Sequence, residues 1–214
     1  GIRTGTLPWK ASFPDVSNLG RHGFGEKGGQ VYTLKAGPID VNHARIVIDD
    51  ARRVYGKVRD KLIRGECDFD FKVWDSARYH VGLNYSGGFS KEVAEDFAID
   101  MAGYFSYVDS VWHEVRGWYG KDTIPFVSDF ASAFSCEDNV SNALGAYVFG
   151  VAMRDDARGF GEAVSVALED ELIRLGAQDG CVGREMSKYT KGPRHFDIGL
   201  SKGFLVPWNV PGVE

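Results

Sequence analysis

The feature that most constrains the fold is the stretch KEVAEDFAIDMAGYFSYVDSVWHEVRGWYG, residues 91–120. Its apolar side chains recur at the spacing of one helix face, a pattern that favours a long amphipathic helix. Ser90 is suited to cap this helix, and Gly120 is suited to end it. The residues predicted to face the core are Phe97, Met101, Tyr104, Tyr107 or Val108, Val111 and Val115.

Three other segments predict shorter helices. One begins near Ile39, where Pro38 fits a first-turn position because its missing N–H donor costs nothing there. Residues 135–154 and 159–177 carry the same helical spacing. The apolar face of the helix near Ile39 comprises Ile39, His43, Ile46 or Val47, Val54, Val58 and Leu62.

Alternating segments predict β-structure. Residues 68–75 and 77–85 both alternate strictly, and their short connection favours a β-hairpin. A second hairpin is predicted over 196–208, and a short strand over 29–37. With the helices, these segments indicate an α+β fold, a mainly helical single domain of about five helices with two small β-hairpins.

The domain organisation is simple. Residues 1–30 are rich in Gly, Pro and Ser and lack periodicity, so they are predicted to form an irregular N-terminal arm anchored by Trp9 and Phe13. Residues 31–214 are predicted to form a single globular domain, because a chain of 214 residues has the usual length for one domain. The chain opens at Gly1 without methionine, which indicates a trimmed chain or a mature form after signal removal.

Composition excludes several classes of function. The net charge of −5 and the lack of a basic stripe argue against a nucleic-acid partner. No apolar run approaches the roughly 20 residues of a transmembrane segment. No Rossmann or phosphate-loop pattern is present, so no nucleotide cofactor is expected. The three cysteines, Cys67, Cys136 and Cys181, lack the spacing of a disulfide-rich scaffold.

The segment VWHEVRGWYG places His113 beside Glu114 on the longest predicted helix. The zinc-protease motif HExxH is absent, because the fourth residue after His113 is Gly117. If a metal binds here, its other ligands must come from other segments. The alternative is a surface glutamate beside a partly buried histidine.

The segment IDVNHAR offers Asp40 as a cap of the first helix, with His43 on the apolar face of that helix. Such a histidine is either a hydrogen-bonded core residue or a metal ligand that faces a neighbouring helix.

The segment SAFSCEDNVSNALG contains Ser135 and Asp138 at the spacing of a capping box, which does not use Glu137. Asn142 is a costly residue inside an apolar helix unless its amide forms a hydrogen bond. A capping role and a catalytic role explain the presence of Asp138 equally well.

Four segments, in this order along the chain, resemble blocks of an uncharacterised bacterial family, domain of unknown function 4056. They are YTLKAGPIDVNHAR (32–45), WHEVRGWYG (112–120), SAFSCEDNVSNALG (132–145) and PWNVPG (207–212). This chain departs from the family pattern at Leu34, where the family block has cysteine.

The resemblance brings no established reaction with it, but it groups polar residues from three helices. Burial of such residues requires partners, so we expect them to converge on one cleft. The residues inside the family blocks are His43, Arg45, His113, Glu114, Glu137, Asp138 and Asn142.

The leading hypothesis is a hydrolase, secreted or in the cell envelope. In its metal-dependent form, His43, His113 and Glu137 or Glu114 hold a divalent metal such as zinc, with a position left for an activated water. The remaining carboxylate then acts as general base, and Arg45 steadies an anionic group of the substrate.

Two alternatives remain open at the level of sequence. In a metal-free enzyme, Glu114 with Glu137 or Asp138 forms an acid–base pair that cleaves a glycosidic bond. In a non-catalytic protein that binds a lipid or glycan, the same polar residues form a buried network that rigidifies the core. The expected partners are accordingly a small molecule, a glycan or a lipid.

Overall fold

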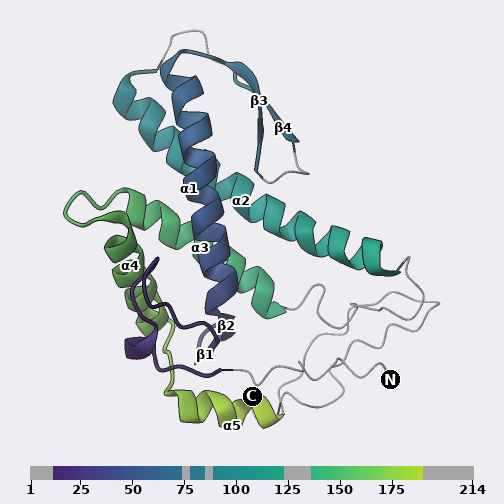
Figure 1. Ribbon diagram of the computed structural model, residues 1–214, viewed down its shortest axis with the longest axis vertical. Coiled ribbons are helices and arrows are strands. Elements are labelled where there is room, and N and C mark those ends of the chain that lie inside the picture. The colour runs from purple at the N-terminus through teal and green to yellow at the C-terminus, as the bar shows by residue number, and fades with distance from the viewer. Residues whose placement is uncertain (1–11, 74–77, 85–88, 123–135, 190–214) are drawn as a thin grey trace.

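The computed structural model describes residues 12–73, 78–84, 89–122 and 136–189. Within these ranges the chain forms five α-helices and two antiparallel sheets of two strands each (Figure 1). The predicted α+β, mainly helical fold is therefore confirmed. None of the helices in the described ranges is both long enough and apolar enough to cross a membrane.

The elements follow the sequence pattern closely in the centre of the chain. The helices at 91–120, 135–154 and 159–177 and the hairpin at 68–85 are confirmed, whereas the helix Gly180–Tyr189 was not predicted. Trp9 and the predicted hairpin at 196–208 lie outside the described residues. In order, the elements are a 3₁₀ turn Val16–Asn18, β1 Gln30–Thr33, β2 Gly37–Asp40, α1 Val41–Ile63, β3 Asp68–Lys72, β4 Arg78–Gly82, α2 Lys91–Asp122, α3 Cys136–Met153, α4 Phe160–Arg174 and α5 Gly180–Tyr189.

The prediction was wrong at the start of α1. Pro38 lies in β2, paired with Tyr32 of β1, and not in a helical turn. Gly37 adopts a positive φ of 74°, which turns the chain back on itself and creates a hairpin where one strand was expected. The helix begins only after Asp40, whose side chain accepts hydrogen bonds from the N–H groups of Asn42 and His43.

Helix α1 is the centre of the fold. Figure 1 shows it running across both α2 and α3, which lie side by side and contact it. The predicted apolar face is buried at Val47, Val54, Val58 and Leu62, while Ile46 is exposed. The hydrophobic effect along this face therefore holds three helices together.

Small residues carry the helix contacts. A Cβ added at Gly145 of α3 would lie 2.3 Å from the carbonyl oxygen of Ala44 in α1, so the two backbones nearly touch. In α2 the fully buried positions include Ala94, Ala98 and Ala102, whereas Tyr104, predicted for the core, is 62% exposed. Such close crossings leave room for glycine and alanine but not for a tyrosine ring.

The β3–β4 hairpin packs on α2 through aromatic rings. Phe71 and Tyr79 both contact Phe105, each with ring centroids 5.0 Å apart. The Tyr79 hydroxyl donates to Asp109 at 3.1 Å. Burial, together with Asp109, raises the pKa of this hydroxyl. On the opposite face of the hairpin His80 is exposed.

We predict that Gly145→Ala lowers the free energy of unfolding by about 1–3 kcal/mol, because the new methyl group forces α3 away from α1. Gly56→Ala is the matched control, since Gly56 lies in α1 with no atom near its missing Cβ. That substitution is expected to stabilise the protein by about 0.5–1 kcal/mol through helix propensity. Urea denaturation measures both changes. Equal stabilisation by the two substitutions would refute the close crossing.

Candidate functional site

The first turns of α1 and α3 bring two of the predicted residues together. Nδ1 of His43 lies 3.2 Å from Oδ1 of Asp138. The side chains are 31% and 14% exposed, so the pair is partly shielded from water but open to a ligand. His43 and Asp138, which are far apart in sequence, therefore lie in contact, as expected if the polar residues of the family blocks converge.

Asp40 joins this pair as a third group. Ligand atoms of Asp40, His43 and Asp138 all lie within 4.8 Å of one another, and all three side chains are partly buried. In the described part of the chain, no other group of three or more His, Cys, Asp or Glu residues has this spacing. We call these three residues the Asp40–His43–Asp138 centre.

Sequence reasoning assigned Asp40 only to capping. Its carboxylate does cap α1, but capping engages one oxygen, Oδ1. The signal that could have identified Asp40 is its spacing of three residues from His43, which puts the two residues on the same side of one helical turn.

Ser141 fixes the two helix ends relative to each other. Its hydroxyl accepts a hydrogen bond from the backbone N–H of Asp40 at 2.8 Å and donates to the carbonyl of Glu137. Ser141 is fully buried, and the neighbouring Asn142 is 3% exposed. The end of β2, the start of α1 and the first turn of α3 therefore form one connected unit.

The electrostatics of this unit follow from the two helices that begin there. The N-terminus of a helix carries a partial positive charge of roughly half an elementary charge. Asp40 is the N-cap of α1, and Asp138 lies in the first turn of α3. Both carboxylates therefore lie at the positive ends of helix dipoles.

The remaining acidic candidate of α3 lies beside the centre. Glu137 is half-buried and precedes Asp138 in the same turn, but its carboxylate is not part of the group within 4.8 Å. Its predicted role as a ligand or base remains a prediction.

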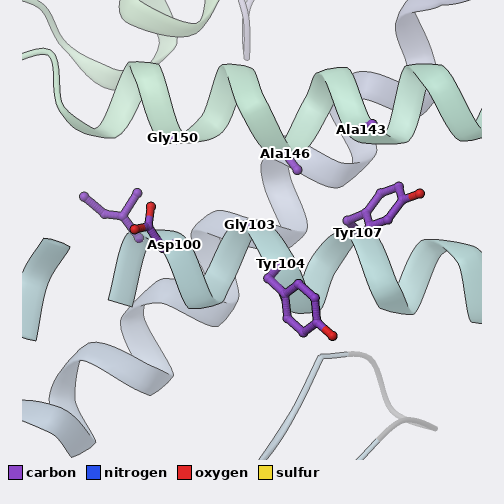
Figure 2. Close-up of a pocket in the computed structure, with 8 residues that line it drawn as sticks. Asp100, Gly103, Tyr104, Tyr107, Ala143, Ala146 and Gly150 are labelled. Carbon is purple, nitrogen blue, oxygen red and sulfur yellow. The ribbon is translucent and has the colours of Figure 1, made fainter. Parts of the chain in front are cut away.

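His113 and Glu114 lie on α2, where His113 is exposed and Glu114 is half-buried. His113 is likewise outside the group of close ligand atoms. Figure 2 shows α2 and α3 running antiparallel, with Tyr107 opposite Ala143. Glu114 lies seven residues, or about two turns, beyond Tyr107, so the two residues lie on the same side of α2.

Arg45 is not brought to the centre. Residues two apart on a helix diverge by about 200°, so Arg45 and His43 face opposite sides of α1. The buried guanidinium donates to the carbonyls of Leu19 and Lys27, each at 2.9 Å. Burial lowers the pKa of Arg45, against the opposing effect of nearby carboxylates. In this arrangement Arg45 holds the backbone at Leu19 and Lys27 against α1.

An open hollow of about 310 Å³ lies between α2 and α3 (Figure 2). It contains none of the predicted site residues. Its Ala143 end is five residues from Asp138, or roughly 7.5 Å along the helix axis. The lining residues are Ile99, Asp100, Gly103, Tyr104, Tyr107, Ala143, Ala146 and Gly150.

We predict that Ser141→Ala destabilises the protein by about 1–3 kcal/mol, because the buried N–H of Asp40 loses its acceptor. Ser110→Ala is the control, since the Ser110 hydroxyl donates only to the Tyr107 carbonyl of its own helix. Its effect is expected to stay within about 0.5 kcal/mol. Thermal unfolding compares the two variants, and similar losses would show that Ser141 does not join the two helix ends.

The comparison with known proteins agrees with the family resemblance, and three of the four blocks lie within the matched residues, whereas PWNVPG (207–212) lies outside them. No curated protein and no solved structure matches this chain. A family profile described as "Protein of unknown function (DUF4056)" matches residues 5–194. Because this match covers most of the 214 residues, the chain belongs to that family.

Proposed function

We propose that this protein is a metal-dependent hydrolase in which the Asp40–His43–Asp138 centre holds a divalent metal such as zinc. The observation that carries the proposal is the close approach of one imidazole and two carboxylates within 4.8 Å. Asp40 and Asp138 take the places that the sequence hypothesis gave to His113 and to Glu137 or Glu114.

The distance between the side chains of His43 and Asp138 supports the binding of a metal. In a tetrahedral site with bonds of about 2.1 Å, two ligand atoms are separated by roughly 3.4 Å. The 3.2 Å between His43 and Asp138 is close to that edge length. Three protein ligands leave a fourth position for water, the pattern of catalytic rather than structural zinc sites.

The chemistry follows from such a site. A divalent metal lowers the pKa of its bound water and so supplies hydroxide at neutral pH. A carboxylate within reach then serves as general base. Glu137 of the same turn and Glu114 of α2 are the two candidates for that role.

The substrate is expected to be a small molecule, a glycan or a lipid. The hollow between α2 and α3 supports this because it offers two tyrosines, Tyr104 and Tyr107, beside small apolar residues. Aromatic side chains of this kind bind both sugar rings and apolar chains.

We predict near-stoichiometric zinc in protein purified without chelator or loaded with the metal, measured by elemental analysis. His43→Ala and Asp138→Asn should each lower the metal content at least tenfold, since each removes one of three ligands. His80→Ala is the matched control, because His80 also lies beside two aspartates, Asp68 and Asp70, but on an exposed strand. A folded wild type that takes up no metal would exclude this form of the enzyme.

Hydrolysis is tested with chromogenic esters, phosphoesters and glycosides, before and after removal of the metal. The metal-dependent form predicts turnover that chelation abolishes and zinc restores. Turnover that survives chelation but is lost in both Glu114→Gln and Glu137→Gln would favour the carboxylate-pair glycosidase instead. Metal uptake without turnover of any compound would favour a binding protein.

A further inference from the structure

Asn142 of α3 carries a buried side-chain amide that the fold leaves without a hydrogen bond. The residue is only 3% exposed, and no hydrogen bond joins its side chain to any residue in the described ranges. The preceding residue, Ser141, is also buried, but its hydroxyl bonds to Asp40 and to Glu137. A buried amide normally has a partner, because burial removes the water that would otherwise bind it.

Asn142 lies on the side of α3 that carries the proposed centre. It follows Asp138 by four residues, so the two positions differ by about 40° around the helix and by about 6 Å along it. Side chains at this spacing are neighbours on a helix surface. Asn142 also precedes Gly145 by three residues, and Gly145 is where α3 meets Ala44, the neighbour of His43. Asn142 therefore stands on α3 between the Asp138 contact and the crossing with α1.

The stability of α3 gives no reason for an asparagine at this position. Asparagine is a poor helix former, because its amide competes with the backbone for hydrogen bonds. The buried residues that follow in α3 are largely apolar, among them Leu144, Val148 and Phe149. Proteins keep a residue that breaks such local rules mainly at functional sites. We therefore examine what an amide at this place could bind.

The charges at the centre favour the donor side of the amide. An asparagine side chain presents two N–H donors and one carbonyl acceptor. A divalent metal held by two carboxylates is neutral overall, and the positive ends of the α1 and α3 dipoles meet at Asp40 and Asp138. Helix starts of this kind bind anions. An anionic oxygen at the fourth position of the metal is therefore favoured, and N–H donors stabilise such an oxygen.

We propose that the Asn142 amide donates a hydrogen bond to an anionic oxygen bound at the open position of the centre, and that the substrate is an ester of a carboxylic or phosphoric acid. This inference rests on the proposed metal centre. Among the small molecules, glycans and lipids named above, it selects those that contain such an ester.

The chemistry of ester hydrolysis suits a neutral donor at this place. The oxygen of water bonds to the acyl carbon or to phosphorus, the bond to the leaving oxygen breaks, and the proton removed from water goes to that leaving oxygen. Negative charge meanwhile gathers on the remaining carbonyl or phosphoryl oxygen, which N–H donors stabilise. Cleavage of a glycoside instead develops positive charge on the sugar ring, which an N–H donor does not stabilise.

The test uses the zinc-loaded full chain with acetate and inorganic phosphate as probes, one for each kind of acid. Titration calorimetry compares the Kd of each anion in the wild type and in Asn142→Leu, which keeps the size of the side chain but removes its donors. Zinc content is expected to be unchanged, because the amide is not a ligand. The Kd of the anion that binds should rise about tenfold or more, since a hydrogen bond to a charged group is lost. The anion that the wild type binds more tightly identifies the class of ester.

The metal-free proteins supply a second readout. Asn142→Leu removes no hydrogen bond from the metal-free fold, so its melting temperature should equal or exceed that of the wild type. Asn139→Leu is the matched control, because Asn139 is exposed and lies about 100° around α3 from Asp138. It should keep the anion affinities of the wild type. If Asn142→Leu does not fold, Asn142→Asp replaces it, since aspartate has the same shape but no N–H donor and repels an anion.

The outcomes separate this role from the metal centre itself. Zinc uptake with unchanged anion affinity in the Asn142 variant, or a zinc-loaded wild type that binds neither anion, would overturn the role of Asn142 and leave the centre in place. A metal-free Asn142→Leu that melts well below the wild type would assign the amide to the stability of the fold instead. A wild type that takes up no zinc would remove the centre, and the role of Asn142 with it.

Discussion

The fold depends on the close contact of α1 and α3 at Ala44 and Gly145. The absence of a side chain at Gly145 lets the two backbones meet, with no room even for a methyl group. Ala44 is the neighbour of His43 in sequence, and Asp138 lies seven residues, or about two turns, before Gly145. The contact that sets the helix crossing therefore also sets the separation of His43 and Asp138.

A second constraint is the need to satisfy buried polar groups where two helices begin. Four N–H groups at each helix start lack partners within the helix. The side chain of Asp40 accepts from two of those in α1, and Ser141 joins the Asp40 backbone to α3. The polar residues that stabilise these helix ends are thus partly the same residues that could hold a ligand.

Sequence periodicity predicted the long elements because their burial is set by local pattern. Helices α2, α3 and α4 and the β3–β4 hairpin each repeat an apolar face often enough to be recognised. The β1–β2 hairpin was missed because Pro38 is common both at helix starts and in edge strands. Tyr104 was misplaced because the contact distance between helices, which favours alanine and glycine in α2, is a property of the whole fold.

The candidate site was only partly accessible to the same reasoning. His43 and Asp138 were singled out by residue type, and the structure brings them together. Asp40 was missed as a site residue because capping already explained it. Arg45 was placed toward a substrate, yet the carbonyls of Leu19 and Lys27 hold it on the opposite side of α1, a long-range contact that no local pattern reveals.

The two helix starts that converge on Asp40 and Asp138 also bear on metal selectivity. Their partial positive charges oppose any cation, by an amount that does not depend on the chemical nature of the metal. Magnesium, which prefers oxygen ligands and gives up its water reluctantly, gains little from an imidazole to offset this repulsion. Zinc and its neighbours bind nitrogen as well as oxygen, so the proposed site would favour such an ion over a hard, weakly held one.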